Sequence, residues 1–292
     1  MGASAVVDAK ASWTLAEGDE IAPGRHVLGA LGGGRATEAY LAWDDRLSSI
    51  IVAKALRPDA AGDERARARL EREGALLQRL AHPVVVRCFA AALGEAVPHL
   101  VLEHVEGPSL RTLVRKHGPL PLEQVLPVAL RVSGALHYLA SEGVVHLDVK
   151  PANVVMDAMP RLVDFGIARS LERAGRMTAP AGTSAYMAPE QHDPRAHGGV
   201  GPPADVWGLG ATLYVALTRR LPFGRAGALD ASARAPELPS DVPRPVAELV
   251  HACLAPDPSD RPPARAIADA LEPLVAMLPR RRSFGRARPR LR

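Results

Sequence analysis

The chain has 292 residues, of which 47% are hydrophobic and 23% charged, so it can bury a core large enough for one large domain or two lobes. Its two cysteines, Cys88 and Cys253, lie far apart without the Cys and His neighbours of a zinc site, which argues against a disulfide framework and for a reducing cytoplasm. The N-terminus lacks the features of a secretory signal, and the most apolar stretch, residues 206–218, is shorter than the ~20 residues of a membrane span. We therefore expect a soluble, cytoplasmic protein.

The positive charge of the chain is concentrated at its C-terminal end. The formal net charge is +4, but the stretch from Arg280 to Arg292 contains seven arginines and no acidic residue, so the rest of the chain is net negative. Such a tail can bind nucleic acid, anionic lipid or an acidic partner. It can equally be a disordered, solubilising end, and the sequence leaves both interpretations open.

The sequence of the first part of the chain predicts an N-terminal lead-in segment followed by a small β-sheet. Residues 1–23 mix small, acidic, Gly and Pro residues, and we expect a poorly ordered segment with Trp13 as its one bulky anchor. Residues 26–56 predict three strands, with a glycine-rich turn at residues 31–40 whose backbone N–H groups can surround an anion. The same turn also fits a plain hairpin.

Lys54 lies in a mostly apolar strand, residues 50–56, where its charge needs a partner. Residues 63–80 carry an apolar stripe at helical spacing and predict an amphipathic helix. Residues 84–92 and 98–103 complete the sheet. Further helices are expected at residues 122–142 and, as a pair, within residues 246–277.

Residues 143–166 bring together side chains suited to phosphate chemistry. Asp148, Lys150, Asn153 and Asp164 lie within this short stretch, whose Pro and aliphatic residues favour a rigid loop and a hairpin over a helix. Two carboxylates, one amide and one ammonium at this spacing can form a site for metal-bound phosphate and a hydroxyl nucleophile. The competing interpretation is a polar turn followed by an unrelated Asp-Phe-Gly turn.

The pattern H-x-D-x-K-x-x-N followed by D-F-G resembles the catalytic and metal-binding loops of bacterial eukaryotic-like (Hanks-type) serine/threonine protein kinases. The resemblance covers about residues 24–278 and implies an α+β, bilobal fold with a five-stranded antiparallel sheet and helix C. It places the small lobe at about residues 24–103, the hinge at 103–107 and the helical lobe at 108–278, with an Arg-rich tail at 279–292. In the glycine-rich loop, Thr37 replaces the third glycine and Ala39 replaces the valine that packs on adenine, so we predict a raised KM for ATP.

The resemblance also implies roles for individual residues. Asp148 would accept the hydrogen bond of the incoming hydroxyl, Lys150 would neutralise the γ-phosphate, and Lys54 paired with Glu73 would hold the α- and β-phosphates. Glu73 could instead be an exposed helix carboxylate. Asn153 and Asp164 would bind Mg²⁺, or alternatively Mn²⁺. The implied ATP site comprises Leu31, Gly32, Gly33, Gly34, Ala39, Ala53, Lys54, Leu102, Glu103, Val105, Asn153 and Asp164.

Other matches to the family concern support and regulation. The resemblance implies a buried Glu190–Arg261 bridge and an Asp205 that braces the catalytic loop. Lys150 and residues 182–190 match the branch of the kinase family that phosphorylates Ser and Thr residues of proteins. Leu147 replaces the arginine of H-R-D, which normally binds a phosphorylated activation-loop residue. We therefore predict an activity that depends little on activation-loop phosphorylation.

Three alternatives to an active protein kinase accompany this interpretation. A pseudokinase acting through partner binding would explain the altered glycine-rich loop and Leu147, but the residues for catalysis are all present. A small-molecule kinase conflicts with the activation segment of residues 182–190. Nucleic-acid binding through the Arg-rich tail could coexist with kinase activity. Sequence leaves the protein substrate, the activating signal and the oligomeric state open.

Overall fold

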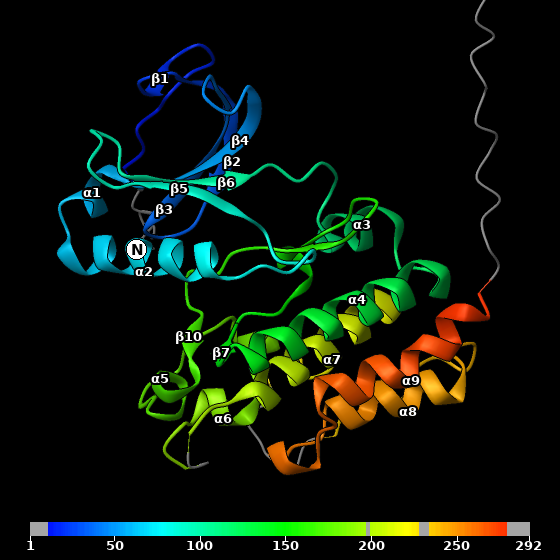
Figure 1. The fold of residues 1–292 in the computed structure, drawn as a ribbon. Helices are drawn as coiled ribbons and strands as arrows, with labels where there is room; N and C mark the ends of the chain where they lie inside the picture. Colours follow the sequence, from blue (N-terminus) through cyan, green and yellow to red (C-terminus); the bar gives the residue numbers. More distant parts are fainter. Residues whose placement is uncertain (1–10, 197–198, 228–233, 279–292) are drawn as a thin grey trace, which may run out of the picture.

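The computed structural model describes residues 11–196, 199–227 and 234–278. Figure 1 shows a small lobe, built from a sheet and helix α2, above a larger helical lobe. The first ten residues and the Arg280–Arg292 tail lie outside the described residues, so the predictions made for the tail stay predictions. In the described part of the chain, no helix is both long and apolar enough to cross a membrane.

The sheet of the small lobe is antiparallel and has the order β1-β2-β3-β4-β6-β5 among the described residues. It contains six strands, not the five predicted. The extra strand is β1, which lies in the region predicted to be a poorly ordered lead-in. Ile21 and Ala22 of β1 are buried, and this apolar pair fixes the segment on the sheet. The strands are β1 (Glu20–Ala22), β2 (Arg25–Gly33), β3 (Thr37–Asp44), β4 (Ser49–Leu56), β5 (Cys88–Ala92) and β6 (His99–Glu103).

The two faces of this sheet belong to different apolar clusters. Successive strand side chains point to opposite faces, and β4 shows this clearly. Ile51, Ala53 and Ala55 join one cluster together with Tyr40, and Trp13 packs against its edge. Val52 and Leu56 contact the other cluster, which continues into the large lobe. The sheet therefore separates two cores, with Lys54, Val52 and Leu56 on the face toward the large lobe and an N-terminal core on the other face.

Helix α2 (Glu64–Arg79) covers the face of the sheet that points to the large lobe, after the short helix α1 (Pro58–Ala61). Asp63 caps α2 by accepting a hydrogen bond from the backbone of Arg65. The packing is close at Gly74, because a Cβ atom there would lie 2.7 Å from Leu100 Cδ2. This close approach fixes the height of the helix above the sheet and hence the position of Glu73, one residue earlier.

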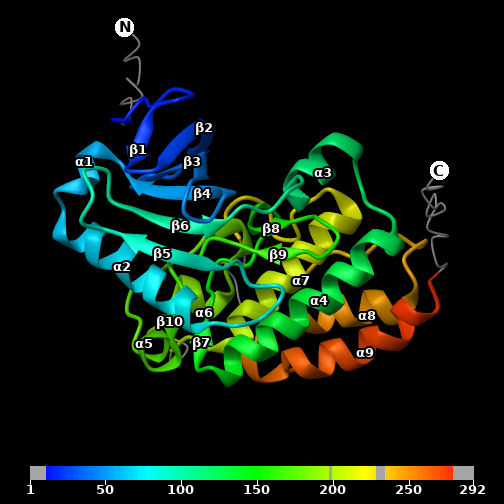
Figure 2. The same ribbon diagram turned by 45° about the horizontal axis from the view of Figure 1, so that its top comes forward.

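The large lobe is mainly helical, as predicted. Helix α7 is almost completely buried at its centre, and α4, despite Pro127 in its interior, packs against both α7 and α9. Figure 2 shows α4 lying beside α9. The helices are α3 (Leu110–His117), α4 (Leu122–Ser141), α5 (Leu171–Gly175), α6 (Pro189–His192), α7 (Pro202–Thr218), α8 (Arg244–Cys253) and α9 (Ala264–Ala276).

Candidate active site

The predicted catalytic loop lies between the lobes. It connects strands β7 (Val144–Val145) and β8 (Val154–Val155), each of which belongs to a short strand pair. Strand β7 pairs with β10 (Arg169–Ser170), and β8 pairs with β9 (Arg161–Leu162). The β8–β9 hairpin brings the segment before it and the segment after it to the same end. As a result, Asn153 and Asp164, at the two ends of this hairpin, lie at one site, and the backbone N–H of Val163 donates to the oxygen of Asn153 at 2.9 Å.

Asp148 is the centre of a hydrogen-bond cluster. Lys150 Nζ lies 2.6 Å from Asp148 Oδ2, and the Thr183 hydroxyl donates to Asp148 Oδ1 at 2.7 Å. Lys150 also donates to Thr183 Oγ1 at 2.7 Å, which closes a triangle. Asn153 Nδ2 donates to the backbone oxygen of Asp148 at 2.9 Å. The cluster holds one carboxylate, one ammonium and one hydroxyl group in a fixed arrangement beside the catalytic loop.

Thr183 was not among the predicted catalytic or nucleotide-binding residues, although it lies in the activation segment of residues 182–190. Its position next to Gly182 in the activation segment was the available signal. Gly182 has a backbone φ of 136°, which residues other than glycine rarely adopt. A Cβ atom at this position would lie 2.9 Å from the backbone oxygen of Leu147. This glycine lets the segment approach the catalytic loop closely enough for Thr183 to reach Asp148.

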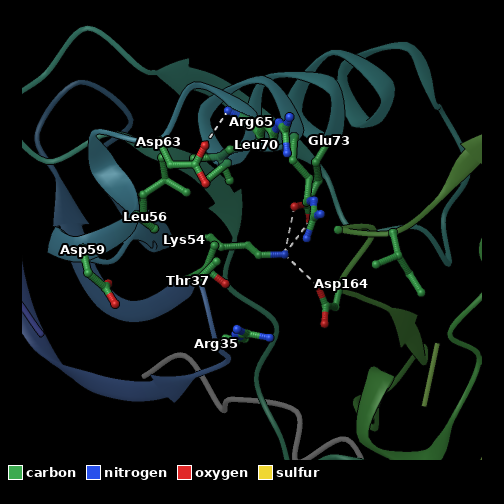
Figure 3. A pocket seen from close by; sticks show the side chains of 16 residues that line it. Arg35, Thr37, Lys54, Leu56, Asp59, Asp63, Arg65, Leu70, Glu73 and Asp164 are labelled. Atoms are coloured by element: carbon green, nitrogen blue, oxygen red, sulfur yellow. Dashed lines mark hydrogen bonds and ion pairs between the residues drawn. The ribbon is translucent and has the colours of Figure 1, made fainter. Parts of the chain in front are cut away.

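A second charge cluster joins the small lobe to the loop, as Figure 3 shows. Lys54 Nζ donates to both oxygens of Glu73 at 2.7 and 2.9 Å and to Asp164 Oδ1 at 2.7 Å. The predicted pairing of Lys54 with Glu73 is confirmed. Burial alone would lower the pKa of Lys54, but the carboxylates of Glu73 and Asp164 outweigh it and raise this pKa to about 12. Lys54 is therefore fully charged at neutral pH.

Asp164 retains capacity for a further ligand. Burial opposes its ionisation, yet Lys54 outweighs burial and lowers the pKa of the carboxyl group. Its side chain is 48% exposed, and Lys54 contacts only Oδ1. Its backbone has φ 65°, a left-handed conformation that costs a non-glycine residue ~1–3 kcal/mol and is found most often at functional sites. An ionised, half-exposed carboxylate of this kind can coordinate a metal ion that is also bound to phosphate.

Asp205 of α7 holds the catalytic loop from below. Its two carboxylate oxygens accept hydrogen bonds from the backbone N–H groups of His146 and Leu147, both at 2.7 Å. Leu147 has φ 69°, so these bonds stabilise a strained backbone. Burial raises the pKa of Asp205 to about 7, although the two N–H groups oppose the shift. The predicted bracing role is confirmed.

The predicted bridge between Glu190 and Arg261 is also confirmed. The guanidinium donates to the two carboxylate oxygens at 2.6 and 2.9 Å, and both side chains are buried. Arg261 also lies 4.9 Å from the ring centre of Trp207, within cation–π distance. This bidentate pair joins the end of the activation segment to the helices of the large lobe.

Leu147 is buried at 3% exposure in the apolar core and offers nothing to a phosphate group. Arginines nevertheless gather nearby, around a cavity of about 810 Å³ between α2 and the activation segment. Burial, together with repulsion from Arg69, Arg72 and Arg173, lowers the pKa of Arg169 in this group. The segment therefore faces positive charge supplied by α2 and β10, and not by the loop position where the family pattern has arginine.

The alternation of side chains along β4 requires one correction to the predicted ATP site. Ala53 is fully buried on the face that points away from Lys54, in the N-terminal core, so it cannot contact a base. Val52, two residues before Lys54, shares the face of Lys54, because strand side chains alternate. Val52 also pairs with Leu102, and Lys54 pairs with Ala39. The period of two, counted back from Lys54, would have identified Val52.

The hinge and the glycine-rich turn lie at the edges of this surface. The backbone N–H of Val105, in the predicted hinge, makes no hydrogen bond to another described residue. Leu31 is 55% exposed and Gly32 has φ 103°. At Gly33 a Cβ atom would collide with the backbone of Thr37, which explains that glycine. Gly34 closes the turn by donating to the oxygen of Thr37 at 2.8 Å.

Comparison with known proteins agrees with this geometry. The model of the protein kinase domain family matches residues 25–271. Serine/threonine-protein kinase PkaA of Streptomyces coelicolor is 35% identical over 232 residues, which cover 76% of this chain and 42% of the relative. The PknB serine/threonine-protein kinases of Mycobacterium leprae and Mycobacterium tuberculosis are each 36% identical, over 68% of this chain and 33% of the relative. The chain thus spans less than half the length of these relatives. With the family model matched over most of its length, the chain belongs to the protein kinase family.

Proposed function

We propose that this chain transfers the γ-phosphate of ATP to serine and threonine hydroxyl groups of proteins, its own included. The triangle of Asp148, Lys150 and Thr183 carries the proposal. An acceptor hydroxyl needs a carboxylate to receive its hydrogen bond and a nearby cation to neutralise the phosphate, and the triangle supplies both within 3 Å. The named kinases among the relatives support the same assignment.

In this proposal the side chains mainly hold groups in place and balance charge. Asp148 orients the acceptor hydroxyl and takes its proton late in the transfer, while Lys150 balances the negative charge of the phosphate. Lys54, held by Glu73, binds the α- and β-phosphates. Because Lys54 also contacts Asp164, the two lobes must be closed for this set to be complete.

Asn153 and Asp164 are the residues that would bind a divalent cation, Mg²⁺ or alternatively Mn²⁺. Asn153 donates to Asp148 through its amide nitrogen, which leaves its amide oxygen as a ligand, and Asp164 is ionised and half-exposed. Such oxygen ligands suit a hard cation. A bound cation there neutralises charge on the phosphate oxygens.

The test is incubation of the purified chain with Mg-ATP and a generic basic protein, followed by mapping of the phosphorylated residues. We expect phosphate on Ser and Thr with the wild-type chain, and none with Lys54→Met or Asp148→Asn. Asp148→Asn keeps the size of the side chain and removes its charge, so it separates chemistry from folding. Equal phosphorylation by wild type and Asp148→Asn would refute the proposal.

A further inference from the structure

We infer that residues 11–15, here called the N-terminal strap, hold the glycine-rich turn in its nucleotide-binding shape through Glu38 and Arg57. The inference rests on the proposed function, because it concerns how the same site binds ATP. Glu38 and Arg57 are then positioning residues, since they act on the nucleotide only through the turn.

The strap is bound to the small lobe by specific hydrogen bonds. The Trp13 indole N–H donates to the oxygen of Leu56 at 2.7 Å, and the Trp13 backbone N–H donates to Glu38 Oε1 at 3.0 Å. The ring of Trp13 and the side chain of Leu15 pack on the apolar cluster that includes Tyr40. The strap therefore covers the face of the sheet that α2 leaves open.

Glu38 and Arg57 form an ion pair under this cover. Their side chains are 6% and 12% exposed, and Arg57 Nη1 lies 3.0 Å from Glu38 Oε2. The strap satisfies both members, because Trp13 donates to Glu38 and the oxygen of Ala11 accepts from Arg57 at 3.0 Å. A buried ion pair depends on such additional hydrogen bonds. The Tyr40 hydroxyl also donates to Glu38 Oε1 at 2.9 Å, so removal of the strap would take one hydrogen bond from each member of the pair and leave the others in place.

Arg57 connects this pair to the glycine-rich turn. Its Nε donates to the oxygen of Gly34 at 3.1 Å, and its backbone N–H donates to the oxygen of Ala36 at 2.9 Å. The two bonds hold both sides of residue Arg35, at the tip of the turn. The turn borders a cavity of about 570 Å³, and Figure 3 shows Arg35 and Thr37 on it near Lys54. A single guanidinium thus holds the strap, the ion pair and the turn together.

The first experiment compares Arg57→Lys with Arg46→Lys. Lysine at position 57 keeps the charge but loses the forked geometry that joins Gly34, Glu38 and Ala11. We expect KM for ATP to rise about fivefold to tenfold, which corresponds to the net loss of roughly one ordinary hydrogen bond, with kcat changed less than about twofold. Arg46 is exposed in the β3–β4 turn, and the same substitution there should leave both constants unchanged.

The second experiment tests the route through the strap. Trp13→Phe keeps a ring and deletes the indole N–H, while Trp43→Phe is the matched control at an exposed tryptophan of β3. We expect Trp13→Phe to raise KM for ATP and to speed amide hydrogen exchange in residues 33–37, with Trp43→Phe without effect. Because Trp13 and Arg57 act on one network, the double variant should raise KM by less than the product of the single effects.

The outcomes separate this inference from the proposed function. Direct titration with Mg-ATP and hydrogen exchange report on the turn even if no phosphate is transferred. Wild type that binds Mg-ATP without phosphorylating protein would refute the proposed function and leave the inference standing. A lowered melting temperature with unchanged KM, unchanged Kd for Mg-ATP and unchanged exchange at residues 33–37 would mean that the strap serves only stability, and would overturn the inference.

Discussion

The bracing of the catalytic loop by Asp205 yields the sharpest prediction from this structure. Asp205→Asn preserves shape but replaces one acceptor oxygen with an amide nitrogen. Both original oxygens accept short backbone hydrogen bonds, from His146 and Leu147. After the change one of these buried N–H groups faces another donor and has no acceptor.

These two hydrogen bonds set how much the free energy of unfolding should fall in Asp205→Asn. A buried donor left without a partner costs ~1–3 kcal/mol, and here a backbone N–H and the new amide group are both affected, so we expect a loss of ~2–6 kcal/mol in the free energy of unfolding. Leu147, released from its left-handed backbone, can relax and carry Asp148 with it. A displacement of ~1 Å at a catalytic group can cost ~100-fold in rate. We therefore expect kcat to fall far more than KM for ATP changes.

Urea unfolding gives the stability, and steady-state phosphorylation of a protein substrate gives kcat and KM. Thr212→Val is the matched control, because Thr212 is also buried on α7 and its hydroxyl has no hydrogen bond within the described residues. That variant should be neutral or slightly stabilising and fully active. An Asp205→Asn variant with wild-type stability and kcat would show that the loop holds its shape without this carboxylate, and would refute the reasoning.

Three further predictions concern the nucleotide, the activation segment and pH. Ala39→Val restores about two methyl-sized carbons, worth ~1–2 kcal/mol if buried against adenine, and should lower KM for ATP by up to about tenfold; an unchanged KM would place the base elsewhere. Because Leu147 cannot bind phosphate, phosphatase treatment should leave activity nearly unchanged. Loss of activity with recovery on autophosphorylation would instead assign the phosphate to the arginines around Arg169. The raised pKa of Lys54, about 12, means that its contribution to stability is complete below its ordinary value and is lost as pH rises through 12. The lowered pKa of Asp164 means that its contribution is complete above its ordinary value and is lost as pH falls through the lowered one. Burial raises the pKa of Glu73, and Lys54→Met would leave this carboxyl group without its ammonium partner, so the stability advantage of wild type over Lys54→Met should fall as Glu73 gains its proton on acidification and fall again as pH rises through 12; a stability difference that does not change on acidification would contradict the assignment.

Much of the site could be predicted because its residues are close in sequence. The loop that contains Asp148, Lys150 and Asn153 needs only a short turn and a hairpin to assemble, and the residue types themselves indicate phosphate chemistry. The assignment of Ala53 failed for a local reason, since the alternation along β4 was not applied from Lys54. The strand β1 was missed because a strand of three residues has too little pattern to distinguish it from a loop.

The order of the helices and strands and the residue types of the loop at 143–166 could be read from the amino-acid sequence, because periodicity and local composition report on these directly. Only the tertiary structure placed Thr183 against Asp148, and only it joined Glu38, Arg57 and the strap into one network. These contacts unite segments far apart in the chain, and no local pattern records which distant group satisfies a buried charge. The requirement that every buried charge find a partner decides them, and that requirement operates only in the folded molecule.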